Sequence, residues 1–230
     1  MNHIAEHIQS LKEQLPSSVT LVAVSKYHSN EEILEAYHAG PRVFGENLVQ
    51  ELRSKQEALP KDIEWHFIGH LQTNKVKYIA PFVSMIHAVD SYKLLEEINR
   101  QAQKHNRIIP VLLQIHIAQE ETKFGFSFSE CDHLLETCPW TTLQNIDIRG
   151  LMCIASNTDD TQQIQSEFHE MYSYFENIRE KYFSQHPSFT CRSWGMSDDY
   201  PLAIQEGSNM VRIGSLIFGV RDYSKKNNLT

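Results

Sequence analysis

The stretch LVAVSK, residues 21–26, joins a buried strand to a lysine. Its first four residues are apolar or small, so neither face is polar, which is typical of a strand in a parallel sheet covered on both sides. Lys26 ends this strand and is followed by the polar residues 27–30. The lysine is either a solvent-exposed charge at a strand end or a side chain held at a pocket, and the rest of the chain bears on that choice.

Outward from this stretch, apolar strands alternate with amphipathic helices along the chain. We predict strands at residues 20–25, 42–44, 64–68, 84–88, 108–117, 146–154, 189–193 and 210–213. We predict helices after them at residues 29–40, 48–58, 72–79, 92–105, 129–137, 160–183 and 198–206, and an extra helix before the first strand at residues 2–14.

Alternation of strands and helices predicts an α/β fold with a parallel sheet. Eight strands favour a single small (β/α)8 TIM barrel. A doubly wound open sheet, with its ligand at a switch in strand order, is the alternative. Because no segment rich in Pro, Gly or Ser divides the chain, we expect residues 1–230 to form one domain with the extra N-terminal helix and a short polar C-terminal tail at residues 225–228.

Composition narrows the class of protein. The 230 residues carry a net charge of -8, which argues against a general nucleic-acid binder. We expect neither a signal peptide nor a membrane span, because the chain has no basic N-terminal region followed by an apolar run and no apolar stretch of about 20 residues. The four cysteines, Cys131, Cys138, Cys153 and Cys191, form no CxxC pair, which favours a reduced, cytoplasmic protein.

A metal site is not predicted, although the chain has 12 histidines. His66 and His70 are four residues apart, a spacing that would place them on one face of a helix. Trp65 and Phe67 instead predict a strand there, and Gly69 would break a helix. We therefore expect these histidines to be ordinary core or surface residues.

Polar, glycine-containing segments follow several predicted strands, where a barrel places its chemistry. They are residues 45–47, 69–75, 195–199 and 212–215, in addition to Lys26. The last two pair Gly195 with Ser197 and Gly214 with Ser215, at the loops after strands seven and eight that often bind phosphate in barrels. Glycine lets backbone N–H groups approach an anion, and we expect each serine to donate a hydroxyl and to cap the next helix. Two ordinary turns with helix caps are the alternative.

A phosphate site gives Lys26 two uses: it could hold the phosphate by charge, or form a Schiff base with a carbonyl once desolvation lowers its pKa. Arg212 lies in the last predicted strand and points either into the barrel or into the helix layer. Inside, it could donate to a ring nitrogen of a cofactor. The alternative is an ion pair with Glu206 or Asp198 at the rim.

Six blocks of sequence together resemble the pyridoxal phosphate homeostasis proteins (the YggS/PROSC-like family). They are AVSK at 23–26, RVFGENLVQE at 42–51, EWHFIGHLQTNK at 64–75, RGLMCIA at 149–155, GMSDDY at 195–200 and GSNMVRIGSLIFGVRDY at 207–223. The resemblance covers nearly the whole chain in order. It departs at His70, where proline is common, and at Trp194, where a smaller aliphatic residue is frequent.

The resemblance implies a barrel of the alanine racemase N-terminal type (fold type III) that binds pyridoxal 5'-phosphate (PLP). Lys26 would form the Schiff base, and Asn47 would lie beside the cofactor ring. Met196, Ser197, Gly214 and Ser215 would form the cofactor-binding loops around the phosphate, and Arg212 would face the pyridine nitrogen. Because arginine does not give up its proton, that nitrogen would stay unprotonated and the ring would be a weaker electron sink.

Three functions follow from these residues. The expected one is a PLP carrier without catalytic turnover and without catalytic residues, a cytoplasmic monomer that passes PLP to apo-enzymes and takes part in vitamin B6 homeostasis. The alternative is a racemase or decarboxylase of the same fold type. Such racemases carry a further β domain with a catalytic tyrosine, which this sequence is expected to lack; Tyr27, Tyr200 and His70 are weak substitutes. A sugar-phosphate enzyme would need paired carboxylates, and Asp90, Glu120 and Asp198-Asp199 show no such spacing.

Overall fold

The eight strands form one closed parallel barrel in the order β1 to β8, and β8 pairs with β1. The structure is a computed structural model that describes residues 3–119 and 124–219. The strands are β1 Thr20–Val24, β2 Val43–Glu46, β3 Glu64–Phe67, β4 Met85–Val89, β5 Ile109–His116, β6 Ile146–Ile154, β7 Cys191–Ser193 and β8 Met210–Ile213. The predicted (β/α)8 barrel is therefore confirmed, and the open sheet is wrong.

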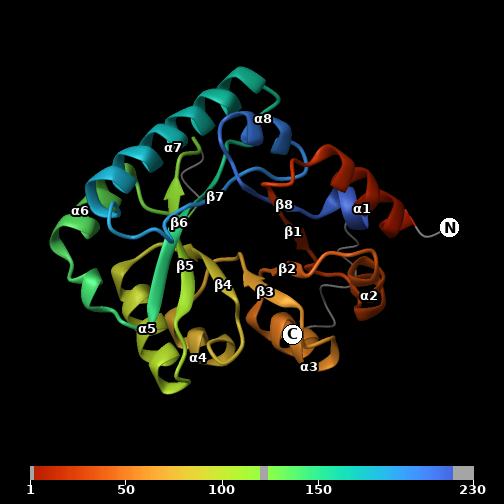
Figure 1. Ribbon diagram of the computed structural model, residues 1–230, viewed down its shortest axis with the longest axis horizontal. Coiled ribbons are helices and arrows are strands. Elements are labelled where there is room, and N and C mark those ends of the chain that lie inside the picture. The colour runs from red at the N-terminus through yellow and green to blue at the C-terminus, as the bar shows by residue number, and fades with distance from the viewer. Residues whose placement is uncertain (1–2, 120–123, 220–230) are drawn as a thin grey trace.

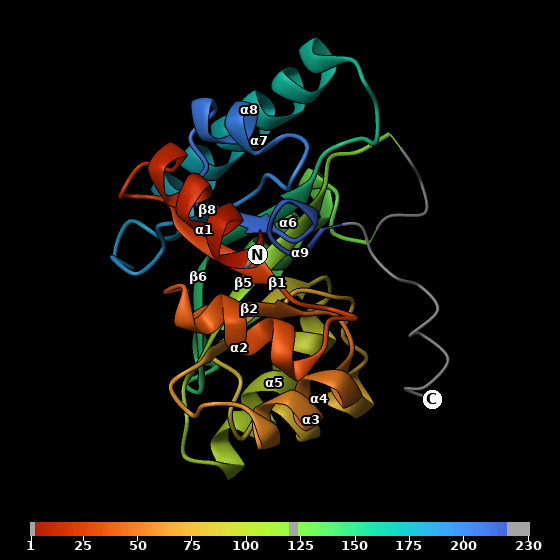
Figure 2. The ribbon, with the colours of Figure 1, turned by 90° about the vertical axis from the view of Figure 1, so that its right-hand side faces the viewer.

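Helices ring the barrel on its outside (Figure 1). They are α1 His3–Gln14, α2 Asn30–His38, α3 Val49–Ala58, α4 Val76–Ile79, α5 Tyr92–Lys104, α6 Phe128–Thr137, α7 Thr161–Tyr182, α8 Tyr200–Gln205 and α9 Ser215–Phe218, with two 3-10 turns, η1 Thr73–Lys75 and η2 Trp140–Thr142. The predicted extra helix is α1, which packs against α2 and α9 (Figure 2). His7 Nδ1 lies 3.0 Å from the backbone oxygen of Ile217 in α9, so the first helix contacts the last.

Local sequence explains where several helices begin. Ser29 caps α2 and forms a capping box with Glu32. Ser127 and Glu130 repeat the same box at the start of α6. Each box satisfies two backbone N–H groups that the first helical turn leaves without intrahelical acceptors. These helix starts are therefore specified by residues four positions apart or fewer.

The structure departs from the predicted elements in several places, among them the 3-10 turn η2, which was not predicted. Residues 72–79 form the 3-10 turn η1 and the single turn α4 instead of one helix. Strand β7 begins at Cys191 instead of 189, because Phe189 packs in the helix layer, with its ring stacked on Phe183 at 3.9 Å. Helix α9 after β8 is the helix that Ser215 was expected to cap, but no bounds were predicted for it. The predicted polar tail at 225–228 and the candidate carboxylate Glu120 lie outside the described residues.

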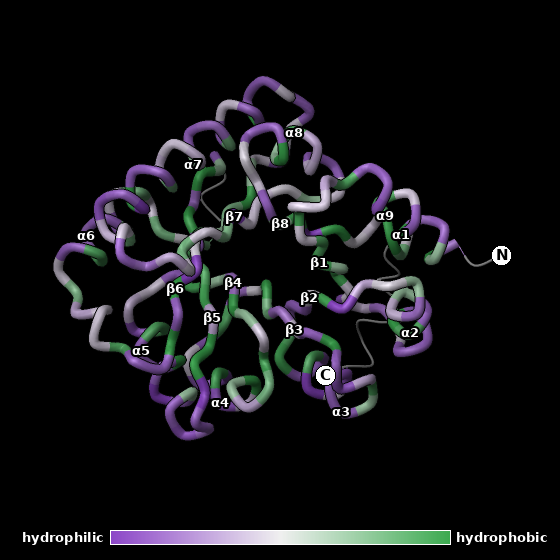
Figure 3. Tube along the Cα trace, in the orientation of Figure 1, coloured by the Kyte–Doolittle hydropathy of each residue, from purple (hydrophilic) through white to green (hydrophobic). Residues whose placement is uncertain are grey.

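The core has two parts. The larger part fills the layer between the strands and the helices, and hydrophobic residues accordingly follow the strands and the inner sides of the helices in Figure 3. The smaller part lies inside the barrel and consists of Val22, Met85, Ala88, Leu112, Met152, Cys191 and Met210. The barrel is thus a packed core, as its size requires. Among the described residues, the longest helices are too polar to cross a lipid bilayer.

Candidate functional site

A pocket lies at the carboxyl ends of the barrel strands. Its lining is Val24, Lys26, Asn47, Ile68, Ile154, Met196, Ser197, Asp198, Arg212, Gly214 and Ser215. All seven residues that the resemblance assigns to cofactor binding are in this set, although they come from positions between 26 and 215 of the chain. Strands β1, β2, β3, β6 and β8 end at or beside these residues, so the parallel barrel brings them together at one mouth.

The loops after β7 and β8 are tied to each other. The backbone N–H of Gly214 donates to Ser197 Oγ at 3.3 Å, and the N–H of Arg212 donates to the backbone oxygen of Gly195 at 3.0 Å. Asp199 holds the first loop by accepting from the N–H of Met196 at 2.5 Å. Two hydroxyls, Ser197 and Ser215, therefore face one pocket from two connected loops.

The two serines do not cap the following helices, so that prediction is wrong. Asp199 occupies the N-cap position of α8 and Gly214 that of α9, and neither makes a side-chain cap bond. Ser197 is instead used to bridge the loops. Helices α8 and α9 have six and four residues, so their dipoles contribute little at this site.

Both the backbone conformation and the packing at position 195 require a glycine. Its φ of +92° is in the region that favours glycine, and a Cβ there would lie 2.6 Å from the Cβ of Ala203 in α8. The glycine thus lets the loop pack directly on α8. Its role is to shape the loop that presents Met196 and Ser197 to the pocket.

Arg212 points into the barrel. Its Nη1 donates to the backbone oxygen of Ser193 at 2.6 Å and to Ser193 Oγ at 2.8 Å, and its Nη2 donates to the backbone oxygen of Cys153 at 2.8 Å. The predicted alternative, an ion pair with Glu206 or Asp198, is wrong, since Glu206 pairs with His169 and Gln165 on the surface. Burial lowers the pKa of Arg212, but a guanidinium stays protonated in proteins, so the pocket has a fixed cation in its wall.

Two buried histidines extend this contact across the barrel. His87 Nδ1 lies 3.1 Å from Ser193 Oγ, and His87 Nε2 lies 2.9 Å from His66 Nδ1. Burial lowers the pKa of His66 to about 4, and burial together with His66 and Arg212 lowers the pKa of His87 well below its usual range. Both rings are therefore neutral at pH 7, and hydrogen bonds connect Arg212 to His66 through the barrel interior.

A buried ionic cluster lies behind Lys26. Lys55 Nζ donates to Glu46 Oε1 at 2.8 Å and to Glu51 Oε1 at 2.6 Å. Ser25 Oγ also donates to Glu46 Oε1, at 2.5 Å. Burial is the main cause that raises the pKa of Glu46 to about 7, with Glu51 adding to it and Lys55 opposing it. The residues before and after Lys26 are held by this cluster.

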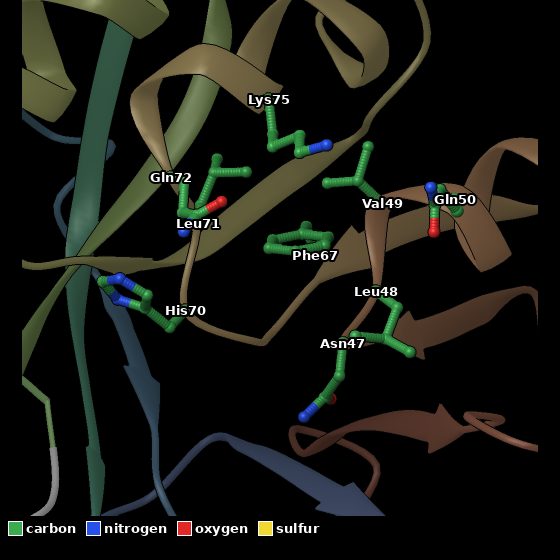
Figure 4. Close-up of a pocket in the computed structure, with 9 residues that line it drawn as sticks. All are labelled: Asn47, Leu48, Val49, Gln50, Phe67, His70, Leu71, Gln72 and Lys75. Carbon is green, nitrogen blue, oxygen red and sulfur yellow. The ribbon is translucent and has the colours of Figure 1, made fainter. Parts of the chain in front are cut away.

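Asn47 is shared with a second, neighbouring pocket. This pocket is lined by Asn47, Leu48, Val49, Gln50, Phe67, His70, Leu71, Gln72 and Lys75, and Figure 4 shows the Asn47 amide turned away from Phe67. Asn47 Oδ1 is buried and has no hydrogen-bond partner among the described residues. Such an atom is rare in a folded protein, and of the described residues that have one, Asn47 alone lines the Lys26 pocket.

Several other candidates from the sequence lie away from the pocket. The Tyr200 hydroxyl donates to Gln14 in α1 at 2.8 Å. His70 pairs with Asp90 at 2.9 Å and stacks on Phe124. Over residues 3–119 and 124–219, His, Cys, Asp and Glu side chains form no group of three that could hold a metal ion.

The cluster of Glu46, Glu51 and Lys55 was missed from the sequence. Its signals were a glutamate at the end of an apolar strand and a Glu–Lys pair four residues apart on the next helix. Such a pair normally lies on the solvent side of a helix. Here both side chains are buried, so the helix presents charges to the barrel.

The chemistry of the pocket can be stated from its donor set. It contains one primary amine at Lys26, two hydroxyls, the guanidinium of Arg212 and an amide oxygen without a partner. Hydroxyls and a cation suit a small anion, and an amine can condense with an aldehyde. The lining therefore suits a small molecule that carries both an aldehyde and an anionic group.

Comparison with known proteins agrees with this geometry. The profile of the family "Alanine racemase, N-terminal domain" matches residues 1–222. A "Pyridoxal phosphate homeostasis protein" of Vibrio alginolyticus is 38% identical over 97% of this chain and 100% of its own length. A protein of the same name from Aquifex aeolicus is 38% identical over 97% of each chain.

Solved structures give the same picture. PipY of Synechococcus elongatus without PLP aligns with a TM-score of 0.88 and 38% identity, over 94% of this chain and 100% of that chain. PipY with PLP bound aligns with a TM-score of 0.85 and 37% identity, over the same shares of the two chains. Alanine racemase of Bartonella henselae shares the fold alone, with a TM-score of 0.72 and 18% identity over 95% of this chain and 59% of that one.

Proposed function

Because this chain belongs to the pyridoxal phosphate homeostasis protein family, we propose that it holds PLP as a Schiff base on Lys26 and takes part in intracellular PLP homeostasis. The observation that carries the proposal is the pocket that gathers Lys26, Ser197, Ser215 and Arg212 at one barrel mouth. It is supported by the PipY structure with PLP bound, at 37% identity. PLP supplies an aldehyde that condenses with amines and a ring that can accept electrons.

Each pocket residue has a proposed role. The Lys26 amine forms a C=N bond with the aldehyde carbon, and the aldehyde oxygen leaves as water with the two amine protons. The phosphate is held by the hydroxyls of Ser197 and Ser215 and by the loop at Gly214. Met196, in the same loop as Ser197, lies at the rim of this phosphate site. Asn47 presents its unpartnered oxygen beside the ring.

Arg212 is proposed to face the pyridine nitrogen. Its guanidinium is held by three hydrogen bonds to Ser193 and Cys153, so it is rigid and keeps its protons. A carboxylate at this position would favour a protonated ring nitrogen, and an arginine favours the unprotonated one. The ring is then a poorer electron sink, which suits storage more than turnover.

We propose a carrier without catalytic turnover, and a racemase or decarboxylase is the second candidate. The second candidate is favoured by the fold shared with alanine racemases. The carrier is supported by the pocket lining, where the described residues offer Lys26, Asp198 and Arg212 as ionisable side chains. Racemisation needs a second acid or base opposite the lysine. The described part of the lining has no tyrosine, histidine or cysteine for that role, and its one carboxylate, Asp198, follows Ser197 in the loop proposed to hold the phosphate.

The cellular setting is part of the same proposal. We place residues 1–230 in the cytoplasm as one monomeric barrel domain that passes PLP to apo-enzymes, with no nucleic-acid or membrane partner. The cysteines support the location, because all four are free thiols and three of them are buried. The net charge of -8 supports the absence of a nucleic-acid partner.

The test is an absorption spectrum of the protein incubated with PLP, before and after borohydride, followed by peptide mapping. The expected result is a visible imine band that collapses on reduction and leaves a pyridoxyl group on Lys26. Lys26→Ala abolishes the band, and Lys104→Ala, at an exposed lysine on α5, leaves it unchanged. A protein that stays colourless with PLP, or a label on another lysine, overturns the proposal.

A further inference from the structure

We propose that Lys55, Glu46 and Glu51 are positioning residues for Lys26: as a buried cluster they fix the backbone on both sides of this lysine and so direct its amine. The inference rests on the proposed function of Lys26. None of the three residues lines the pocket, so they act through the chain segment that carries the lysine.

Hydrogen bonds reach the segment from both directions. Before Lys26, the backbone oxygen of Ser25 accepts from Lys55 Nζ at 2.7 Å, and the Ser25 hydroxyl donates to Glu46 Oε1. After Lys26, the backbone N–H of Tyr27 donates to Glu51 Oε1 at 2.6 Å. Lys55 connects both sides, because it donates to Glu46 and Glu51 together.

The backbone after Lys26 needs this support. Tyr27 has a φ of +68°. Residues other than glycine rarely adopt this conformation, and it persists only when the surrounding structure enforces it. Glu51 supplies such a constraint through the Tyr27 N–H. Strand β1 ends at Val24, and the chain turns at Lys26 and Tyr27, so the conformation of Tyr27 helps to set the direction in which the lysine leaves the barrel wall.

Removing the three charges of this cluster from water costs free energy, and a gain in stability alone does not explain why they are buried. The side chains of Lys55 and Glu51 are 6% and 3% exposed and that of Glu46 is fully buried. Glu46 Oε2 and Glu51 Oε2 are buried without hydrogen-bond partners among the described residues. Buried ion pairs are often matched or exceeded in stability by apolar residues, so a cluster of three charges against one backbone segment points to a specific geometry.

The experiment compares two ligands on the same variants. PLP requires the Lys26 amine, whereas pyridoxine 5'-phosphate, which has no aldehyde, reports only on the pocket and its phosphate site. We expect Lys55→Met to slow imine formation with PLP on the order of tenfold to a hundredfold, and to shift the pH profile of that rate. Its affinity for pyridoxine 5'-phosphate changes by less than about twofold, and Lys55→Arg restores part of the rate.

Controls keep the outcomes distinct. Lys104→Met, at an exposed lysine, is expected to match the wild type with both ligands. If Lys55→Met does not fold, Lys55→Met/Glu51→Gln replaces it, because the remaining Glu46 has a raised pKa and can take up a proton. The positioning role is overturned if Lys55→Met weakens the binding of both ligands equally, or if the rate of imine formation with PLP is unchanged. Failure of the wild type to form an imine instead overturns the proposed function.

Discussion

The guanidinium of Arg212 and the backbone of Ser193 are joined inside the barrel, with Nη1 2.6 Å from the carbonyl oxygen. The same side chain lines the pocket of Lys26, so the cation in the pocket wall is held by the neighbouring strand. Its position depends on the planar fork of an arginine, because Nη2 reaches a second carbonyl at Cys153.

Arg212→Lys should therefore destabilise the protein. A lysine cannot reach both carbonyls, and the oxygen left without a donor costs about 2 kcal/mol in the free energy of unfolding. Urea denaturation in the absence of ligand measures this loss. Arg100→Lys, at an exposed ion pair with Glu97 on α5, should change stability by less than about 0.5 kcal/mol. Equal stability of the two variants would contradict the role given to the fork.

The buried histidine pair should make the protein sensitive to acid. Burial lowers the pKa of His66 to about 4, whereas a histidine in the unfolded chain titrates near 6.5. The unfolded chain thus takes up a proton first as the pH falls, and His66 contributes a loss of about 3 kcal/mol between pH 6.5 and 4. Glu46, with its pKa raised to about 7, acts in the opposite direction over much of this range.

The His66 contribution is isolated by comparison with His66→Gln. Glutamine still offers an acceptor to His87 but does not titrate, so the difference in unfolding free energy between the two proteins should change with pH as His66 alone predicts. The measurement is chemical denaturation at several pH values from 7 to 4. If the unfolding free energies of the two proteins changed with pH in parallel, His66 would not be the cause of the lost stability at low pH.

The two pocket hydroxyls should contribute to PLP retention together. Ser197→Ala/Ser215→Ala removes both, and we expect the dissociation constant for PLP to rise on the order of tenfold or more, since hydrogen bonds to a charged ligand are strong. Equilibrium dialysis measures the retention. Ser166→Ala/Ser184→Ala, at two exposed serines, is the matched control. Unchanged retention in the pocket variant places the phosphate elsewhere.

The absence of a side chain at Gly69 should be required for the position of Asn47. A Cβ at this position would lie 2.5 Å from the backbone oxygen of Asn47 and 2.8 Å from its Cα, and backbone cannot yield cheaply. Gly69→Ala is therefore expected to displace Asn47 and to weaken PLP binding several-fold, on the scale of one lost hydrogen bond. In a double-mutant cycle with Asn47→Ala the two effects should not add. Additive effects would mean that Gly69 acts on another part of the pocket.

The carrier proposal predicts that the PLP-bound protein does not turn over amino acids. Incubation with D- or L-alanine, followed by chiral chromatography, should give no more product than the Lys26→Ala variant does. The physical reason is that the described pocket lining offers few groups that could act as the second acid or base. Besides Lys26 and Arg212, its ionisable side chain is Asp198, in the loop proposed to hold the phosphate. Racemisation that depends on Lys26 would favour the enzyme instead.

Much of the fold was predictable because most strands are mainly apolar and are bounded by polar turns, and eight such segments alternating with helices favoured closure. The pocket loops were predictable from their positions after strands seven and eight. The direction of Arg212 was not, because both faces of its strand are apolar and periodicity then assigns no face to the barrel interior. The pairing of His66 with His87 across two strands likewise depends on register, which is set by packing.

The ionic cluster escaped prediction for a different reason. Local rules place Glu51 and Lys55 in contact on one side of α3 but do not state whether that side faces water. The phase of the helix is decided by Leu52 and by the strand residues it covers, and it turns both charges inward. Only the assembled barrel brings Glu46 and Ser25 to meet them.

The barrel closes by pairing its first strand with its last, Thr20 beside Met210 and Ala23 beside Ile213. During synthesis the early strand leaves the ribosome long before its partner exists, so this seam cannot form until nearly the whole chain has emerged. Lys26 and Ser215 lie on the two sides of that seam. A chain that ends before β8 consequently lacks one wall of the pocket, so the aldehyde binding proposed for Lys26 would require that β8 has been made and has paired with β1.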